Sequence, residues 1–146
     1  MINSKISGVG YFVPDNVVKN SHLEKMMNTT DEWIRERTGI EERRWVNDQK
    51  LTTSLMGTYA AENAISDAGL QRDDIDFIIF STLSPDYYFP GSGVLLQRNL
   101  KIKEIGALDV RNQCSGFIYG LSIADQYIKS GMYKNILVVG SEIHSG

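Results

Sequence analysis

Short apolar runs separated by helical segments are the feature that most limits how this chain can fold. Residues 76–83 form a largely continuous apolar run of strand length, which is typical of a strand buried on both faces. Residues 105–111 and 135–141 are predicted to be two further strands, with helices between them. Parallel strands need a crossover connection, usually a helix, so this order predicts an α/β fold with a mostly parallel sheet covered by helices.

The segments before the first buried strand carry start and stop signals of helices. The patterns Ser21-x-x-Glu24 and Thr29-x-x-Glu32 both fit the capping box, in which a hydroxyl and a carboxylate bind each other's backbone N–H groups. They predict two short helices, the second ending at Gly39.

Two longer segments complete the expected organisation. Thr52 or Thr53 is expected to begin a helix that stops at Gly69. Residues 6–13 are an apolar stretch with glycines and are predicted to be a strand. Gly8-Val9-Gly10 does not continue into a dinucleotide-binding loop, because the third glycine position holds Val13 and no helix begins there.

Composition sets outer limits on function. The chain has 146 residues, which suits one domain over 1–146, and a net charge of −3, which gives no basic surface for nucleic acid. A single cysteine excludes an internal disulfide and fits a reducing compartment. No apolar run reaches the roughly 18 residues of a membrane span, and the N-terminus lacks a signal-peptide pattern. We therefore expect a cytoplasmic protein without a membrane span.

The only cysteine, Cys114, lies where a reactive thiol would be placed. It follows the strand predicted at 105–111, and the amphipathic helix after it runs to Gly131. A sulfur in the first turn of a helix is close to unpaired N–H groups and the positive end of the helix dipole, which favour the thiolate nucleophile. The alternative is that Cys114 is a small core residue.

A catalytic cysteine needs a base, and the chain has only two histidines. His22 lies in a short predicted helix and is expected to be a solvated surface residue. His144 follows a strand at the carboxyl edge, where α/β sites form, and could approach Cys114. The sequence alone does not establish that pairing.

Two aromatic segments are candidate binding surfaces. Trp33 and Arg37 are four residues apart on a predicted helix and share a face, so they could stack on a base and bind a phosphate. Alternatively, Trp33 anchors the helix while Arg37 pairs with an acidic neighbour or water. The run that ends with Phe89-Pro90 is predicted to be a loop acting as an apolar lid or as an interface.

The longer motifs resemble one family, the β-ketoacyl-acyl-carrier-protein synthases III. The resemblance runs from the first predicted strand to residue 146 and is most specific at 29–44, 109–117 and 124–131. It implies the N-terminal half of a thiolase-like fold, truncated before its final strand. It also implies an acyltransferase of fatty-acid or related acyl-chain biosynthesis that uses a coenzyme A thioester as substrate, with no separate cofactor and no metal.

The resemblance assigns roles residue by residue. Cys114 is expected to take the acyl group from acyl-coenzyme A before condensation with malonyl-acyl-carrier protein, and its N–H to bind the oxyanion. Trp33 matches a residue that stacks on adenine, Arg37 one that holds the nucleotide, and Thr29 a further polar contact. Phe89 matches a residue that closes the acyl pocket of the partner subunit. The intact enzyme is expected to be a homodimer, joined through the strand at 105–111.

Some positions depart from the family pattern. The family's catalytic histidine and asparagine have no counterpart in this chain, so the chain alone is expected to be inactive in condensation. Arg111-Asn112-Gln113 replaces the small residues that many relatives carry before the cysteine, which could signal a primer other than acetyl. The alternatives are a related acyl transfer or long-chain condensation in the same superfamily, and a non-catalytic dimerisation fragment.

Overall fold

The computed structural model describes residues 2–48, 50–112 and 114–145. Two compact units are present. Unit 1 comprises Met1–Phe12 and Leu51–Ile143, and unit 2 comprises Val13–Lys50 and His144–Gly146.

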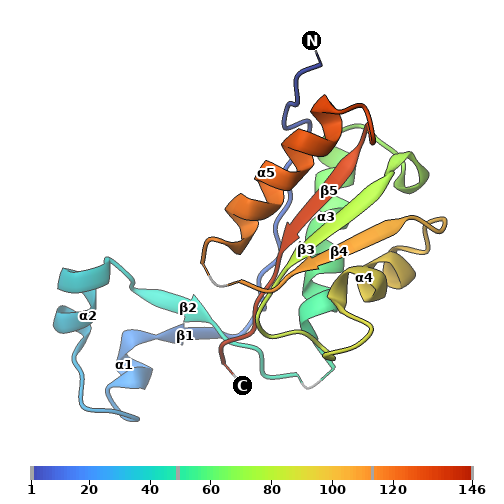
Figure 1. The fold of residues 1–146 in the computed structure, drawn as a ribbon. Helices are drawn as coiled ribbons and strands as arrows, with labels where there is room; N and C mark the ends of the chain where they lie inside the picture. Colours follow the sequence, from blue (N-terminus) through green and yellow to red (C-terminus); the bar gives the residue numbers. More distant parts are fainter. Residues whose placement is uncertain (1, 49, 113, 146) are drawn as a thin grey trace. The chain divides into compact units, whose positions relative to one another are not determined.

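Unit 1 is built on a three-stranded parallel sheet (Figure 1). Its strands are β3 (Phe77–Ser81), β4 (Gly106–Val110) and β5 (Ile136–Gly140), in the order β4-β3-β5. Every residue of β3 is buried, as the continuous apolar run predicted, because this strand is central and covered on both faces. The register aligns Ser81 with Val110 and with Gly140, so the three strands end at one edge.

Helices cover the two faces of this sheet unequally. Helices α3 (Thr53–Asp67) and α4 (Ser92–Leu100) pack on one face, and α5 (Gly116–Lys129) packs on the other. A short 3₁₀ helix, η1 (Arg72–Asp74), precedes β3. The face under α3 and α4 holds the larger core, whose buried members are Ala61, Ile65, Ile75, Ile78, Phe80, Leu96, Leu100, Leu137 and Val139. The predicted α/β fold is confirmed.

The N-terminal segment differs from its prediction. Residues 6–13 form no strand in the structure, although the segment packs along α3. A Cβ atom on Gly8 or Gly10 would overlap the backbone of α3 at Ala64 or Ala60, so these glycines permit a close approach that other residues would block. The apolar pattern was therefore produced by packing against a helix rather than by pairing with a strand.

Unit 2 is a small α+β unit that the sequence described only in part. Strands β1 (Val17–Lys19) and β2 (Glu42–Arg44) pair antiparallel, and helices α1 (Asn20–Leu23) and α2 (Asp31–Thr38) lie between them in sequence. Helix α2 ends at Gly39 in the left-handed conformation, as predicted.

The predicted caps of these two helices were displaced. Thr30, not Thr29, caps α2 and accepts a hydrogen bond from the Trp33 N–H at 3.1 Å. Helix α1 begins one residue earlier than its pattern indicated and has no side-chain cap, since Lys19 precedes it. The longer helix α3 is capped by Thr52, one of the two predicted positions.

Among the described residues, no helix is both long and apolar enough to cross a membrane.

Candidate active site

Cys114 is exposed at the junction between β4 and α5. Strand β4 ends at Val110 and α5 begins at Gly116, with Ser115 as its N-cap. The thiol therefore lies at the predicted strand-to-helix junction but precedes the helix instead of occupying its first turn. Because the first N–H groups of a helix have no intrahelical partner, Cys114 still lies at the donor-rich end of α5.

Small residues bring this end of α5 close to the sheet. The Ser81 hydroxyl, at the end of β3, donates to the Gly116 carbonyl at 3.0 Å. Gly120 faces the same strand, and a Cβ there would lie 3.2 Å from Ile79 and from Val138. These contacts fix the start of α5, and with it the segment that carries Cys114, at the carboxyl edge of the sheet.

A loop of exposed aromatic side chains begins at the same edge. Residues 82–91, which we call the aromatic loop, connect β3 to α4. Tyr88 is 96% exposed and Phe89 is 89% exposed, and the Phe89–Pro90 peptide bond is cis. The predicted loop is confirmed, and its exposed tip is consistent with both the lid and the interface readings.

In unit 2, Trp33 and Arg37 lie together on α2. The Arg37 guanidinium lies over the Trp33 ring, 4.9 Å from its centroid, and the Trp33 side chain is half exposed. The predicted shared face is confirmed. Arg37 does not take the acidic partner that the alternative reading allowed, since Glu41 pairs instead with Arg35 at 2.9 Å.

Thr29 precedes this helix and carries an unusual hydroxyl. Its Oγ1 atom is buried and has no hydrogen-bond partner among the described residues. A buried hydroxyl without a partner is costly, so a ligand atom that satisfied it would be favoured. Thr29, Trp33 and Arg37 thus form one compact candidate surface at the start of α2.

Asn20 holds this helix in place. Its side chain is buried, donates to Asp31 at 2.7 Å and to the Ile40 carbonyl at 2.8 Å, and accepts from Arg43 at 2.6 Å. Asp31 and Ile40 flank the two ends of α2, so one amide links both ends of the helix to β2.

The structure brings neither histidine into the unit of Cys114. Both His22 and His144 are exposed and belong to unit 2, where His22 packs edge-on against Trp45 with 6.1 Å between ring centroids. The surface role predicted for His22 is confirmed, and the pairing of His144 with Cys114 stays a prediction. Within the described ranges, no cluster of His, Cys, Asp or Glu could hold a metal ion.

Comparison with known proteins gives this geometry a family. A model described as 3-oxoacyl-[acyl-carrier-protein (ACP)] synthase III matches residues 108–146. A curated β-ketoacyl-[acyl-carrier-protein] synthase III of Chlamydia pneumoniae is 49% identical over 137 residues, which are 94% of this chain and 41% of that protein. The crystal structure of 3-oxoacyl-[acyl-carrier-protein] synthase III from Aquifex aeolicus VF5 superposes with a TM-score of 0.90 at 48% identity, covering 94% of this chain and 44% of that one.

By sequence and by fold, the chain matches the β-ketoacyl-acyl-carrier-protein synthases III. It spans less than half the length of the relatives it matches. A priming β-ketosynthase of the R1128 polyketide pathway is also similar, with a TM-score of 0.90 at 33% identity, covering 94% of this chain and 41% of that one. The synthase III family model includes Cys114, β5 and the end of β4.

Sequence reasoning missed a carboxylate at this edge of the synthase-like sheet. Glu142 follows β5, and its side chain accepts hydrogen bonds from the Thr82 hydroxyl at 2.8 Å and from the N–H groups of Leu83 at 3.0 Å and Ser84 at 2.6 Å. Burial raises the pKa of Glu142, but the hydrogen bonds from Ser84, Leu83 and Thr82 outweigh it and hold the pKa below its ordinary value. An acid directly after a buried strand was the available signal.

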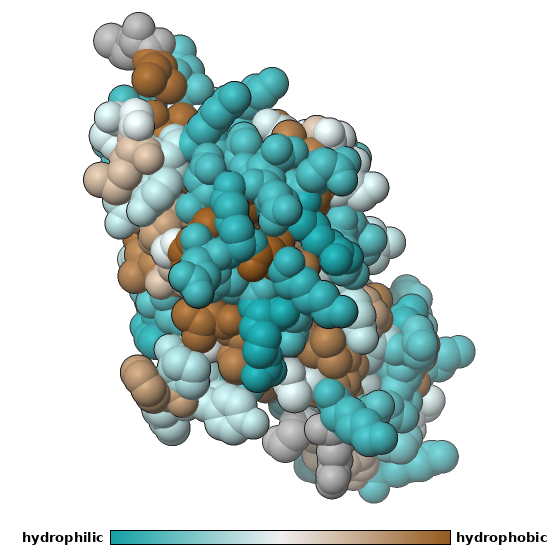
Figure 2. All heavy atoms as spheres, turned by 90° about the vertical axis from the view of Figure 1, so that its right-hand side faces the viewer, coloured by the Kyte–Doolittle hydropathy of each residue, from teal (hydrophilic) through white to brown (hydrophobic). Residues whose placement is uncertain are grey.

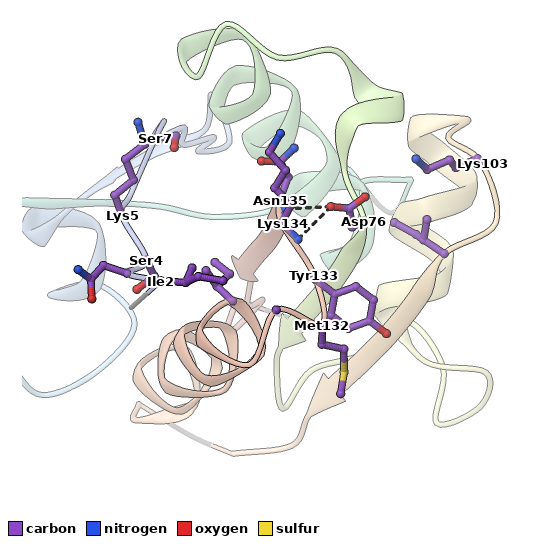
Figure 3. A pocket seen from close by; sticks show the side chains of 14 residues that line it. Ile2, Ser4, Lys5, Ser7, Asp76, Lys103, Met132, Tyr133, Lys134 and Asn135 are labelled. Atoms are coloured by element: carbon purple, nitrogen blue, oxygen red, sulfur yellow. Dashed lines mark hydrogen bonds between the residues drawn. The ribbon is translucent and has the colours of Figure 1, made fainter.

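The largest hollow in unit 1 lies away from these residues. It has a volume of about 680 Å³ and lies at the amino ends of the strands, beside Ser4, Asp76, Lys103 and Tyr133 (Figure 3). Asp76 accepts hydrogen bonds there from the N–H groups of Lys134 and Asn135. None of the predicted site residues lines this hollow, so it is separate from the candidate site at the carboxyl edge.

Proposed function

We propose that this chain carries the acyl-accepting part of a β-ketoacyl-acyl-carrier-protein synthase III site. The observation that supports this most is the exposed Cys114 at the strand-to-helix junction, inside the segment that the family model matches. Carboxyl edges of parallel sheets are where α/β enzymes place their sites.

The proposed reaction has two steps. The Cys114 thiolate attacks the carbonyl carbon of acyl-coenzyme A, a new carbon–sulfur bond forms, and coenzyme A leaves with its electron pair and takes up a proton. Malonyl-acyl-carrier protein then loses CO₂, which leaves an electron pair on its α-carbon. That carbon attacks the acyl-enzyme, the bond to Cys114 breaks, and the thiolate is regenerated. The Cys114 N–H is proposed as one donor to the oxyanion in both steps.

We assign the surface on α2 to coenzyme A. The exposed Trp33 ring offers a stacking face for adenine, the Arg37 guanidinium offers charge to a phosphate, and the unpartnered Thr29 hydroxyl offers a hydrogen bond. Phe89 is proposed to contact the acyl chain of the partner subunit.

Acyl-carrier protein and a second copy of the enzyme are the proposed partners. Strand β4 is at the edge of the described sheet, and its outer side is unpaired among the described residues. On the side of unit 1 that carries β4 and α4, hydrophilic side chains alternate with separate hydrophobic areas (Figure 2). An open strand edge is a ready partner for an identical strand, which supports the homodimer. The cytoplasm is the proposed location.

Intact mass spectrometry tests the first step. We expect incubation with acetyl-, isobutyryl- or octanoyl-coenzyme A to add one acyl group to the chain, and Cys114→Ser to remove that addition. With malonyl-acyl-carrier protein also present, the chain alone is expected to release no β-ketoacyl product, because unit 1 holds no histidine. A folded chain that accepts no acyl group from any of the three donors would favour a non-catalytic dimerisation role.

The likeness to a priming β-ketosynthase of a polyketide pathway supports a second candidate, priming with a starter other than acetyl. The same incubation separates the two, because a fatty-acid primer enzyme favours acetyl- or short branched donors. A preference for octanoyl-coenzyme A would support the second candidate or a long-chain condensation.

A further inference from the structure

The exposed tip of the aromatic loop contrasts with its firmly held ends. Tyr88 and Phe89 are almost fully solvated, whereas both flanks of the loop are tied down by carboxylates that accept backbone N–H bonds. Such bonds are charge-assisted and roughly twice as strong as neutral ones.

Asp109 holds the end that enters α4. Its carboxylate accepts from the N–H groups of Ser92 at 2.7 Å and Gly93 at 2.8 Å. The side chain is only 18% exposed, and it fits between two glycines: a Cβ on Gly91 or Gly93 would lie 2.9 Å from a carboxylate oxygen. The position is therefore built around this carboxylate.

Asp86 and Glu142 hold the other flank. Asp86 lies in the loop and accepts from the Ser54 N–H and from the Thr52 hydroxyl, each at 2.8 Å, at the start of α3. Glu142 binds the N–H groups of Leu83 and Ser84, as described above. Only the tip, residues 87–90, lies between these anchors.

The same aspartate connects the loop to the cysteine. Asp109 lies on β4, the strand that leads to Cys114, and β4 is the direct neighbour of β3, from which the loop begins. Any displacement of the aromatic tip relative to Cys114 therefore passes through the contact between Asp109 and Gly93. Arg111 approaches Asp109 only at 3.5 Å and is partly exposed, so it supports this contact weakly.

We propose that Asp109 is a positioning residue for acyl-chain selection: it fixes the aromatic loop against β4 and so sets which acyl chains reach Cys114. This rests on the proposed function for the role of Cys114. Holding a loop in one geometry discriminates between chain lengths, whereas a released loop accommodates many.

Two substitutions break the same contact from opposite sides. Asp109→Asn keeps the shape but replaces one acceptor oxygen with a donor, and Gly93→Ala pushes a methyl group against the carboxylate. Asp76→Asn is a matched control, because Asp76 also accepts two backbone N–H bonds but at the opposite edge of the sheet. Arg111→Gln tests whether the ion pair alone matters.

Two measurements on the 146-residue chain are expected to move together. Chymotrypsin cleavage after Tyr87 and Tyr88, followed by mass spectrometry, should rise about tenfold in Asp109→Asn and Gly93→Ala, because cleavage follows local opening. The ratio of octanoyl to acetyl transfer onto Cys114 should change at least about threefold in both variants, and the double variant should add little. Alkylation of Cys114 by iodoacetamide should stay unchanged. Asp76→Asn and Arg111→Gln should match the parent.

The outcomes separate this proposal from the proposed function. If the parent chain is acylated and the variants keep its donor ratio, Asp109 has no positioning role and the function stands. Unchanged cleavage of the loop in both variants would equally overturn the positioning role. If no donor acylates the parent chain, the function and the selection role fall together.

Discussion

At the scale of single residues, Glu142 is the clearest case of a side chain whose ionisation matters to structure. Its charged form accepts every hydrogen bond described above, and its pKa is accordingly lowered from 4.5. A group whose pKa is lower in the folded state stabilises the fold above its unfolded pKa. That contribution is lost as the pH falls through the folded value.

We therefore expect local protection at the carboxyl edge to depend on pH. In the parent chain, the protection of the Leu83 and Ser84 N–H groups against hydrogen exchange should be full at pH 7 and decline below pH 4.5. In Glu142→Gln it should be about tenfold lower at pH 7 and nearly independent of pH. Protection of the Ser81 N–H within β3 serves as the internal reference. Equal protection in both chains at pH 7 would contradict the role of the carboxylate.

Trp33 gives a second residue-scale test. Trp33→Ala should slow acylation of Cys114 by acyl-coenzyme A about tenfold at low donor concentration, because an aromatic stack contributes about 1–3 kcal/mol. Acylation by a donor without the nucleotide, such as an acyl-N-acetylcysteamine thioester, should be unchanged. Phe12→Ala, a change to a ring that packs on Tyr59 in unit 1, is the control. A Trp33 variant that slows both donors equally would argue against adenine stacking.

The sequence predicted some of these residues and not others for a physical reason. Trp33 and Arg37 could be paired in advance because helical spacing alone puts positions four apart on one face. Glu142 and Asp109 bind N–H groups 58 or 59 and 16 or 17 residues away in sequence. No local pattern reports contacts of that range, so only the fold could reveal them.

At the scale of elements, the N-terminal segment shows how close packing substitutes for pairing. Gly8 and Gly10 let residues 8–10 lie directly against the backbone of α3, and the Val9 N–H is satisfied by the Asp67 carboxylate at 2.9 Å. The segment is thus held by glycine contacts and side-chain hydrogen bonds instead of a ladder.

A side chain at these glycines should release the segment. Gly10→Ala is expected to raise the rate of trypsin cleavage after Lys5 about tenfold, because the new methyl group overlaps the backbone of α3 and the segment must shift. Ser7→Ala adds no such overlap and should behave like the parent chain. Unchanged cleavage of Gly10→Ala would show that the segment is held elsewhere.

Elements with strong periodicity were predictable, and short polar ones were not. β3 was found because five consecutive residues are buried, and α3 because its cap and stop are both local signals. β1 and β2 have three residues each, and β2 consists of Glu42, Arg43 and Arg44, which carry no strand signal. Residues 6–13 were wrong because alternating apolar residues mark extended chain, whether or not a neighbouring strand is present.

At the scale of the whole molecule, unit 1 is more completely covered on one face than on the other. The face under α5 has only Phe77, Ile79 and Ala124 buried. On α5 itself, Phe117 is 42%, Ile118 is 61% and Tyr119 is 51% exposed. Adjacent exposed apolar side chains of this size are uncommon on an isolated globular surface.

This exposure should be measurable in solution. We expect the chain to increase the fluorescence of the dye ANS in native buffer, and Ile118→Gln to lower that signal by roughly half. Ile40→Gln, which changes an exposed residue of unit 2, should lower it little, because single apolar side chains are ordinary surface features. An equal loss from both variants would show that the dye does not report on α5.

The placement of Cys114 in unit 1 has a practical consequence. It is the only thiol of the chain, it is exposed, and both tryptophans, Trp33 and Trp45, belong to unit 2. A maleimide-linked acceptor dye would therefore attach at one place, with its natural donors all in the other unit. Energy transfer from tryptophan to that dye would act as a built-in ruler between the thiol and the adenine-binding surface proposed here, and its change on adding coenzyme A would report how the two units respond to the nucleotide.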